Sequence, residues 1–319
     1  MDVTPEINLT VEPYLNGVRV DSFLSRHLRN YTNFRIQRMV HTGQVRISDA
    51  TVPLSQRVFV GQTVGVRLVE PPDKLYEAQP LAISIVFEDP WIMVIDKPAG
   101  MVAHPVGPHQ TGTLCNALQW YLDQTSLCRG ILRPGIVHRL DRMTSGLIVI
   151  AKDHLSHRHL SLDFQNERVS KSYLAIVEGQ PRDAGVINLP IGRAAGDETI
   201  LMTTREDAIK PRPARTNYKV LQRDESVSLV KAKPFTGRNH QIRVHLAAIG
   251  HPVVGDDYYR ANGKLKPKRP DAFESPSRHA LHAHALQFAH PITRVWMEFE
   301  SQVPDDMSRL IHAQICSRL

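Results

Sequence analysis

The sequence predicts an α+β fold in which a small α/β unit precedes a mainly antiparallel sheet with flanking helices. Short β-type segments dominate the chain after residue 81, and few crossover helices separate them, which favours antiparallel over doubly wound parallel pairing. The segment before residue 72 combines two helical patterns with short strands. At 319 residues, the chain is long enough for one large domain and one small domain.

Two helical patterns open the small unit, which we delimit to residues 15–72. Residues 19–28, RVDSFLSRHL, have apolar side chains at helical spacing, with Asp21 and Ser22 as candidate caps. Residues 33–43, NFRIQRMVHTG, carry a second apolar stripe and end at Gly43, a typical helix stop. The alternating stretches VRI, RVFV and TVGVRLV that follow indicate strands.

The small unit holds most of the excess positive charge of the chain. The chain has a formal net charge of +7 and a pI near 9.4, and residues 19–70 contain eight arginines against three acids. Such charge favours an anionic partner, most often nucleic acid, and the alternative is a solvated charged face. Because guanidinium groups bind phosphates bidentately, Arg35, Arg38 and Arg46 are the candidate phosphate contacts.

The stretch EPPDKLYEAQP has three prolines and several charges, so residues 73–80 are the predicted linker. Residues 81–319 then form the predicted large domain. Its β-type segments are SIVF, WIMVID, LIVIA, YLAIVE, YKVLQ and VSLVKAK, and its clearest helical patterns are LSLDFQNERV and HQIRVHLAAIG.

The run HRLDRMTSG, residues 138–146, concentrates polar groups directly before the apolar segment LIVIA. Burying such a set is costly unless its members pair with one another or line a cleft. Arg139 and Arg142 flank Asp141, and nearby positive charge keeps a carboxylate ionised, as a nucleophile or base requires. Taken alone, however, the run favours a salt-bridged turn that enters a strand.

Two further motifs supply candidate partners. In TGRNHQIRVHL, residues 236–246, Thr236 or Asn239 is the expected helix cap. Arg238 and Arg243 are five residues apart and point different ways, so either is a candidate to balance Asp141. In KSYLAIVEG, residues 171–179, strand alternation places the lysine and the tyrosine on one face, where a tyrosine can stack on a nucleobase.

Taken together, these motifs resemble the catalytic domain of the RluA family of RNA pseudouridine synthases. The resemblance spans IDKPAGMVAHP (95–105), IVHRLDRMTSGLIVIAK (136–152), KSYLAIVEG (171–179), PARTNYKVL (213–221), TGRNHQIRVHLAAIGHPVVGDDYY (236–259) and LHAHALQFAHP (281–291). The segments RVDSFL and RIQRMVHTGQV similarly resemble the S4 RNA-binding domain, although RISDATV replaces the usual V-N-G pattern. The resemblance implies a pseudouridine synthase catalytic fold behind an S4-like RNA-binding domain.

This resemblance implies isomerisation of uridine in RNA, without a cofactor or metal. Asp141 matches the catalytic aspartate, Tyr173 the base-stacking tyrosine, and Arg243 the basic partner of the aspartate. Large-subunit ribosomal RNA is the favoured target, and transfer RNA is the alternative. We assign substrate binding to Arg139, which matches an arginine thought to help flip the base, and to His138, Arg142, Thr144, Arg238, His240 and Gln241.

Other functional classes have weaker support in the sequence. Ser145 lacks the G-x-S-x-G elbow of a hydrolase, and no glycine loop of nucleotide-binding type is present. The histidines of RHALHAHALQFAH alternate with apolar residues, as in a strand, rather than forming a metal site. The main alternative to an enzyme is therefore an RNA-binding or ribosome-assembly protein that has kept the fold without catalysis.

The remaining sequence features concern compartment and partners. Three widely spaced cysteines fit a reducing compartment, and no signal-peptide or membrane-spanning pattern is evident. We therefore expect a cytoplasmic protein with RNA as its partner, no membrane contact and a monomeric state. Residues 261–278 carry five basic residues against two acids, and they are either a second RNA contact or a solvated insertion.

Overall fold

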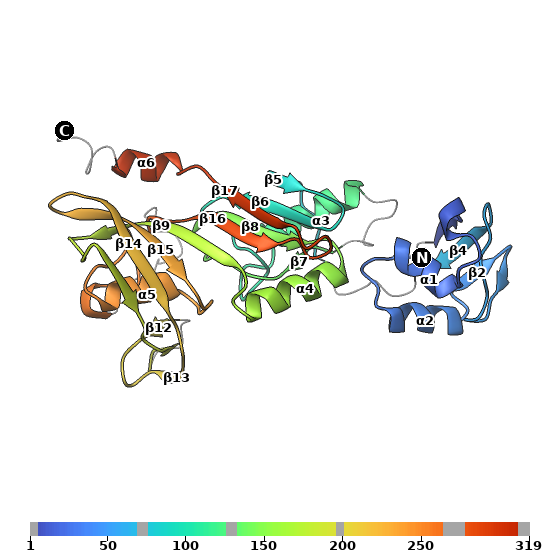
Figure 1. Ribbon diagram of the computed structural model, residues 1–319, viewed down its shortest axis with the longest axis horizontal. Coiled ribbons are helices and arrows are strands. Elements are labelled where there is room, and N and C mark those ends of the chain that lie inside the picture. Colours follow the sequence, from blue (N-terminus) through green and yellow to red (C-terminus); the bar gives the residue numbers. More distant parts are fainter. Residues whose placement is uncertain (1–5, 69–75, 126–132, 196–200, 264–277, 312–319) are drawn as a thin grey trace.

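The computed structural model describes residues 6–68, 76–125, 133–195, 201–263 and 278–311. A small N-terminal unit, residues 6–68, lies at one end of the molecule, and the larger unit contains an extended sheet with helices on both faces (Figure 1). Among the described residues, no helix combines the length and apolar character needed to cross a membrane.

The N-terminal unit packs two helices against a four-stranded antiparallel sheet. The helices confirm both predicted helical patterns, and Val20, Phe23 and Ile36 are fully buried between the helices and the sheet. RVFV forms no strand, and a strand outside the predicted boundary, before residue 15, pairs with β4. The elements are β1 (Glu6–Thr10), η1 (Pro13–Leu15), α1 (Val20–His27), α2 (Asn33–His41), β2 (Val45–Ile47), β3 (Ala50–Thr51) and β4 (Thr63–Arg67), with strand order β1-β4-β2-β3.

The start of α1 differs from the prediction. Arg19 is the N-cap residue and makes no side-chain cap, while Asp21 lies in the first turn and forms an ion pair with Arg19 at 2.8 Å. The prediction of Asp21 or Ser22 as cap was therefore wrong, because the helix begins at Val20, before either residue. In α2, Thr32 caps the helix by accepting a hydrogen bond from the backbone N–H of Arg35.

The larger unit is built on a ten-stranded sheet with the path β10-β14-β15-β9-β16-β8-β6-β5, from which β17 pairs with β16 and β7 with β8. Within the described part of this sheet, β8 and β16 pair in parallel and the other pairings are antiparallel, so the mainly antiparallel prediction is confirmed. A separate small sheet has the order β12-β11-β13.

The strands of the larger unit are β5 (Ser84–Glu88), β6 (Ile92–Lys97), β7 (Gly135–Ile136), β8 (Ser145–Ala151), β9 (Ser170–Glu178), β10 (Ala184–Ile187), β11 (Ile191–Arg193), β12 (Met202–Thr203), β13 (Ile209–Arg212), β14 (Thr216–Arg223), β15 (Val227–Pro234), β16 (Leu281–Ala289) and β17 (Trp296–Glu300). Its helices are α3 (Leu114–Thr125), α4 (His154–Gln165), α5 (Gln241–Ala248), η2 (Ala261–Gly263) and α6 (Asp305–Ile311). All six predicted β-type segments and both predicted helices overlap elements of matching type, although α4 ends at Gln165, inside the predicted LSLDFQNERV.

Strand β8 is apolar from Gly146 to Ala151, as is typical of a strand with both faces buried. Ile148 and Ile150 pack into a cluster that includes α3 and α5, whereas Leu147 and Val149 pack into a second cluster that includes Leu160 of α4. Helices therefore cover both faces of the sheet at this strand. The loop that enters β8 is thereby anchored to a strand that is buried on both faces.

The parallel contact between β8 and β16 places this loop beside the first residues of β16. Ser145 pairs with His282, and Gly146 pairs with Ala283. Gly146 has a φ of 112°, and a Cβ atom there would lie 2.3 Å from the carbonyl oxygen of Ala283. Only glycine permits this close approach of the two backbones.

The two units also touch directly. The Arg29 guanidinium donates to the Asp153 carboxylate at 2.6 Å and lies over the Trp91 ring, 5.5 Å from its centroid. The Asn30 side-chain amide donates to the Lys152 carbonyl at 3.1 Å. The turn between α1 and α2 therefore contacts the loop between β8 and α4.

Candidate active site

The loop that carries Asp141 is held from two sides. Lys97, which is fully buried, donates from Nζ to the Arg142 carbonyl at 3.2 Å and also to two carbonyls of its own segment. On the other side, the Thr144 hydroxyl contacts Nε2 of His279 at 2.7 Å, and the Ser145 hydroxyl contacts Nδ1 of His282 at 3.0 Å. These contacts fix the residues that follow Asp141, from Arg142 to Ser145.

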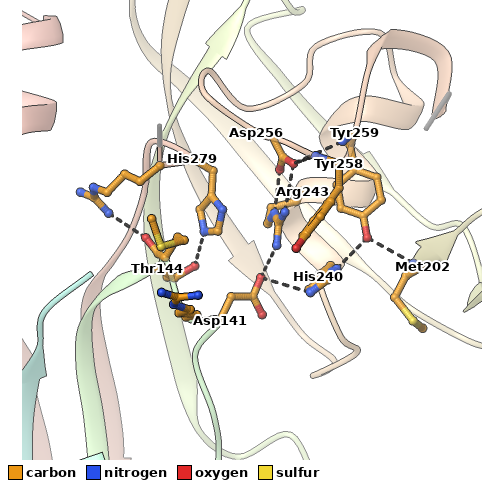
Figure 2. A network of polar contacts seen from close by, with 12 residues as sticks. Asp141, Thr144, Met202, His240, Arg243, Asp256, Tyr258, Tyr259 and His279 are labelled. Carbon is orange, nitrogen blue, oxygen red and sulfur yellow. Dashed lines mark hydrogen bonds and ion pairs between the residues drawn. The ribbon is translucent and has the colours of Figure 1, made fainter. Parts of the chain in front are cut away.

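Arg243 joins two carboxylates that are far apart in the sequence (Figure 2). Its NH1 donates to Oδ2 of Asp141 at 2.8 Å. Its Nε and NH2 donate to the Asp256 carboxylate at 2.6 and 3.0 Å, a bidentate arrangement. Of the two arginines proposed to balance Asp141, the structure selects Arg243, whose side chain is only 3% exposed.

Asp256 fixes Arg243 in place. Its side chain is 1% exposed, and Oδ1 also accepts the backbone N–H groups of Tyr258 and Tyr259 at 2.8 and 3.2 Å. Both tyrosine rings lie near the guanidinium, with centroids 5.3 and 5.2 Å from its Cζ. Both oxygens of this buried carboxylate accept hydrogen bonds, which stabilise its negative charge. The ionised carboxylate therefore forms a stable ion pair with Arg243.

Asp141 is ionised at neutral pH. Burial alone would raise its pKa, but nearby positive charge outweighs burial and lowers the pKa well below the ordinary range. The basic side chains nearest to its carboxylate are Arg243, at 2.8 Å, and His240, at 3.9 Å. Since burial lowers the pKa of His240 to about 4, this ring is neutral at pH 7, and Arg243 supplies the charge.

His240 lies beside the nucleophile candidate in an unusual backbone conformation. It has a φ of 53°, in the left-handed region, and it is the N-cap residue of α5 without a side-chain cap. Its Nε2 is 3.9 Å from Oδ2 of Asp141, and its Nδ1 is 2.7 Å from the Tyr259 hydroxyl. The prediction that Thr236 or Asn239 caps this helix was wrong, because the chain turns sharply at residue 240 and the Thr236 hydroxyl donates to Gln241 instead.

Asp141, His240 and Arg243 line a cavity of about 550 Å³. Its size is within the range of ligand-binding sites, and it takes residues from α4, β9, β13 and the segment that leads into α5. Tyr173 lines the cavity, and 9% of its surface is exposed. Burial and the negative charge of Asp141 both raise the pKa of its phenol, so the hydroxyl stays neutral. Cationic side chains line the same cavity, namely Arg139, Lys171, Arg212, Arg238 and Arg243.

The structure brings most of the proposed substrate-binding residues to this cavity, and Arg139, Thr144, Arg238 and His240 line it with Asp141. The Arg139 side chain is exposed, whereas the Nε of Arg238 donates to the Pro213 carbonyl at 3.0 Å. These positions fit the assignment without testing it.

Three of the proposed substrate-binding residues have structural contacts instead. Arg142 does not line the cavity and donates from Nε to the Gly100 carbonyl at 3.1 Å. His138 lines the cavity, but its Nε2 accepts the Val149 N–H at 3.0 Å and its ring stacks on Phe164. Gln241 is 4% exposed, and both ends of its amide are hydrogen-bonded within the protein.

The proposed RNA-contacting arginines of the N-terminal unit lie on neighbouring elements. Arg35 and Arg38 are on α2, and Arg46 is on β2, with the last two exposed. Residues 264–277 of the proposed basic RNA contact lie outside the described residues. Arg278, at its end, pairs with Asp306 and donates to the Met143 carbonyl, so it supports the Asp141 loop.

Sequence reasoning did not single out Asp256, Tyr259 or His279. Asp256 and Tyr259 lie in the segment VVGDDYY, which is part of the family resemblance. His279 belongs to the histidine-rich segment RHALHAHALQFAH, in which no metal site is expected, and its ring reaches Thr144. The available sequence signal for Asp256 is its position shortly after the helix that carries Arg243.

Comparisons with known proteins identify the family of this chain. A sequence profile described as RNA pseudouridylate synthase matches residues 91–248, which include Asp141, Tyr173 and Arg243. An RNA pseudouridine synthase of Bacillus subtilis (strain 168), named as uncharacterized, is 36% identical over 307 residues, covering 96% of this chain and 97% of the relative. The chain therefore belongs to the RNA pseudouridine synthases, a family of isomerases.

Among the relatives, the ribosomal large subunit pseudouridine synthase D of Nitrosomonas europaea is 37% identical over 308 residues, covering 96% of this chain and 87% of that protein. The corresponding synthase D of Pseudomonas aeruginosa is 36% identical over 302 residues, covering 93% of this chain and 92% of that protein. The solved structure of human RNA pseudouridylate synthase domain containing 4 matches with a TM-score of 0.56 and 27% identity, covering 72% of this chain and 92% of that one.

Proposed function

We propose that this enzyme isomerises uridines in large-subunit ribosomal RNA, with Asp141 as the nucleophile or base. The observation that carries the catalytic assignment is the buried Asp141–Arg243–Asp256 chain at the cavity. It keeps Asp141 ionised and fixed in direction before substrate arrives, which is the preorganisation that catalysis requires. The names of the relatives from Nitrosomonas and Pseudomonas support the choice of RNA.

In the proposed reaction, a uridine leaves its stack and enters the cavity, at a cost of a few kcal/mol. Arg139 helps to displace the base, and Tyr173 stacks on the uracil. The N-glycosidic bond breaks with Asp141 acting on the nucleotide, the uracil rotates, and its C5 bonds to the ribose. The C5 proton is then lost while N1 gains one, so that the product is an isomer of the substrate.

The N-terminal unit supports the same proposal. We infer that it is an S4-like RNA-binding domain within residues 15–72, joined through the linker 73–80 to the catalytic domain 81–319. Its excess of arginines and the exposed Arg38 and Arg46 are suited to a phosphate backbone. We further infer that the enzyme is a cytoplasmic monomer, which light scattering on the purified protein tests.

Release of tritium from RNA labelled at uridine C5 tests the catalytic assignment. The wild-type protein should release tritium, whereas Asp141→Asn, which keeps the side-chain size but removes the charge, should release none. Equal release from both proteins would refute the role of Asp141. Absence of release from both would favour a binding protein.

Mapping of pseudouridines in total RNA, from cells with and without the gene, tests the choice of target. Loss of pseudouridines from large-subunit ribosomal RNA in the cells without the gene is the expected result. Loss confined to transfer RNA would refute the proposed target while leaving the reaction intact. Restoration by the wild-type gene, but not by the Asp141→Asn gene, is the control.

A further inference from the structure

Tyr259 connects the candidate active site to the small three-stranded sheet. Its side chain is 2% exposed and packs with Ile191, Val244 and Ala247. Its hydroxyl lies between two nitrogens: the backbone N–H of Met202 in β12, at 3.2 Å, and Nδ1 of His240, at 2.7 Å (Figure 2).

The direction of these hydrogen bonds follows from the groups involved. A backbone N–H can only donate, so Met202 occupies a lone pair of the Tyr259 oxygen. The hydroxyl proton then has one nearby acceptor in the described structure, Nδ1 of His240. An Nδ1 that accepts leaves Nε2 as the protonated nitrogen of a neutral imidazole.

Several charged and polar groups surround the His240 ring. Asp141 and Asp256 favour a protonated, cationic ring, whereas Arg243 and Arg139 oppose it. Tyr258 stacks on the ring, with centroids 6.0 Å apart. Burial is the largest influence and lowers the pKa to about 4, so the ring is neutral at pH 7.

We propose that Tyr259 is a positioning residue that holds His240 in the Nε2–H tautomer, so that this N–H donates to an oxygen of the uridine bound beside Asp141. At 3.9 Å from Oδ2 of Asp141, Nε2 is too far for a good hydrogen bond with the carboxylate. Nε2 faces Asp141, and His240 lines the cavity that would take the uridine. The proposal rests on the proposed role of Asp141.

A neutral donor at this position suits the chemistry. An imidazolium beside Asp141 would add a second cation next to Arg243 and hold the carboxylate too tightly to react. The opposite tautomer would present a lone pair to the carboxylate and repel it. The Nε2–H tautomer avoids both and supplies a hydrogen bond to the reacting nucleotide.

Tyr259→Phe tests the proposal kinetically, because it removes the hydroxyl and keeps the packed ring. We expect kcat for tritium release to fall about tenfold, the range for loss of one positioned hydrogen bond. In a His240→Asn background, where asparagine tolerates the left-handed backbone, Tyr259→Phe should have no further effect on kcat. Full additivity of the two changes would show that Tyr259 does not act through His240, and would overturn the proposal.

Nitrogen NMR of the full-length protein labelled with ¹⁵N-histidine tests the tautomer directly. His240 is identified by the loss of its signals in His240→Asn. At pH 7 we expect a protonated Nε2 and an unprotonated Nδ1, and a shift toward the other tautomer in Tyr259→Phe. Tyr121→Phe, which removes a remote hydroxyl bonded to Glu88, is the matched control and should change neither the signals nor kcat.

An Nδ1–H tautomer or an imidazolium in the wild-type protein would overturn the proposal. So would an unchanged tautomer and an unchanged kcat in Tyr259→Phe. Failure of the proposed function has a different signature, since the wild-type protein would then form no pseudouridine while the nitrogen signals of His240 could still be read.

Discussion

The charges around Asp141 are held in place by Arg243, which no other side-chain type can replace without loss of a contact. Arg243 contacts Asp141 and Asp256 at once, which requires the planar, multi-donor guanidinium group. A lysine offers one point charge and cannot keep both contacts. The pair of carboxylates therefore explains why an arginine occupies this position.

Asp256→Asn should weaken both stability and activity. The change leaves the buried Arg243 charge with one carboxylate in place of two, and breaking a buried pair costs about 3–5 kcal/mol. We expect a lower midpoint of urea unfolding and at least a tenfold loss of kcat in the tritium assay. The exposed pair of Asp183 and Arg223 is the matched control, because Asp183→Asn should leave the unfolding midpoint nearly unchanged. Similar midpoints for both variants would contradict the structural role of Asp256.

At the scale of elements, the parallel contact between β8 and β16 decides where the loop of Asp141 lies. The contact comprises the pairs Ser145–His282 and Gly146–Ala283. Hydrogen bonds that join the hydroxyls of Thr144 and Ser145 to the rings of His279 and His282 reinforce it. Arg243 reaches the same place from α5, so a change in this contact would separate the loop from its partner.

Gly146→Ala should therefore destabilise the catalytic domain. The added Cβ would lie 2.3 Å from the Ala283 carbonyl oxygen at a positive φ, so the two strands would have to separate. We expect a loss of several kcal/mol in the free energy of unfolding, measured by urea denaturation. Gly237→Ala is the control, since a Cβ there meets nothing within 4 Å. Equal stability of the two variants would show that the close approach is not required.

At the scale of the whole molecule, two units with different charge meet through a small contact. Arg29 bridges to Asp153 and lies over Trp91, which ties the N-terminal unit to the loop after β8. The N-terminal unit carries much of the excess positive charge, and the cavity adds its own basic side chains. Both features suit one long polyanion that contacts the two units together.

Neutralising the basic face of the N-terminal unit should flatten the salt dependence of RNA binding. For the triple variant Arg35→Gln, Arg38→Gln and Arg46→Gln, each lost phosphate contact should lower the slope of log affinity against log salt by about 0.7–0.9. Filter binding over a range of salt concentrations measures the slope. An unchanged slope would exclude these residues from the RNA interface, and single-turnover chemistry at saturating RNA should persist.

The buried histidines should make stability depend on pH. Burial lowers the pKa of His138, His240 and His279 to about 3, 4 and 3, whereas an unfolded histidine titrates near pH ~6.5. Below pH ~6.5 the unfolded chain therefore binds protons that the folded protein does not. The free energy of unfolding should fall as pH falls from 6.5 to 5, by up to about 1.4 kcal/mol per pH unit for each histidine.

Urea unfolding at pH values between 5 and 7 measures this slope. His279→Gln should reduce the slope by up to about 1.4 kcal/mol per pH unit, because it removes one histidine whose pKa is lowered in the folded protein. Over this range the aspartates with lowered pKa values remain ionised in both states, and Lys97, with a pKa of about 7, is mostly protonated below pH 6. Constant or rising stability on acidification would contradict the assignment of neutral buried histidines.

The sequence by itself determined the fold class, the main strands and helices, and the nucleophile candidate. Alternating apolar residues define strands locally, and the HRLDRMTSG run stands out because it places charge directly before a fully apolar strand. It also limited the partner of Asp141 to Arg238 or Arg243. Such features depend on near neighbours in the chain, which sequence patterns report well.

Only the tertiary structure decided how the site is assembled. Asp256 contacts Arg243, Tyr259 contacts His240, and Arg142 is directed to the Gly100 carbonyl, because side-chain direction depends on where strands and loops cross. The cap of α5 was predicted wrongly for the same reason. His240 is the N-cap residue in a left-handed conformation, and its side chain lines the cavity instead of capping the helix. Asp141 by itself was a charged residue in a turn; its contact with Arg243, 102 residues away, is what makes it a preorganised carboxylate.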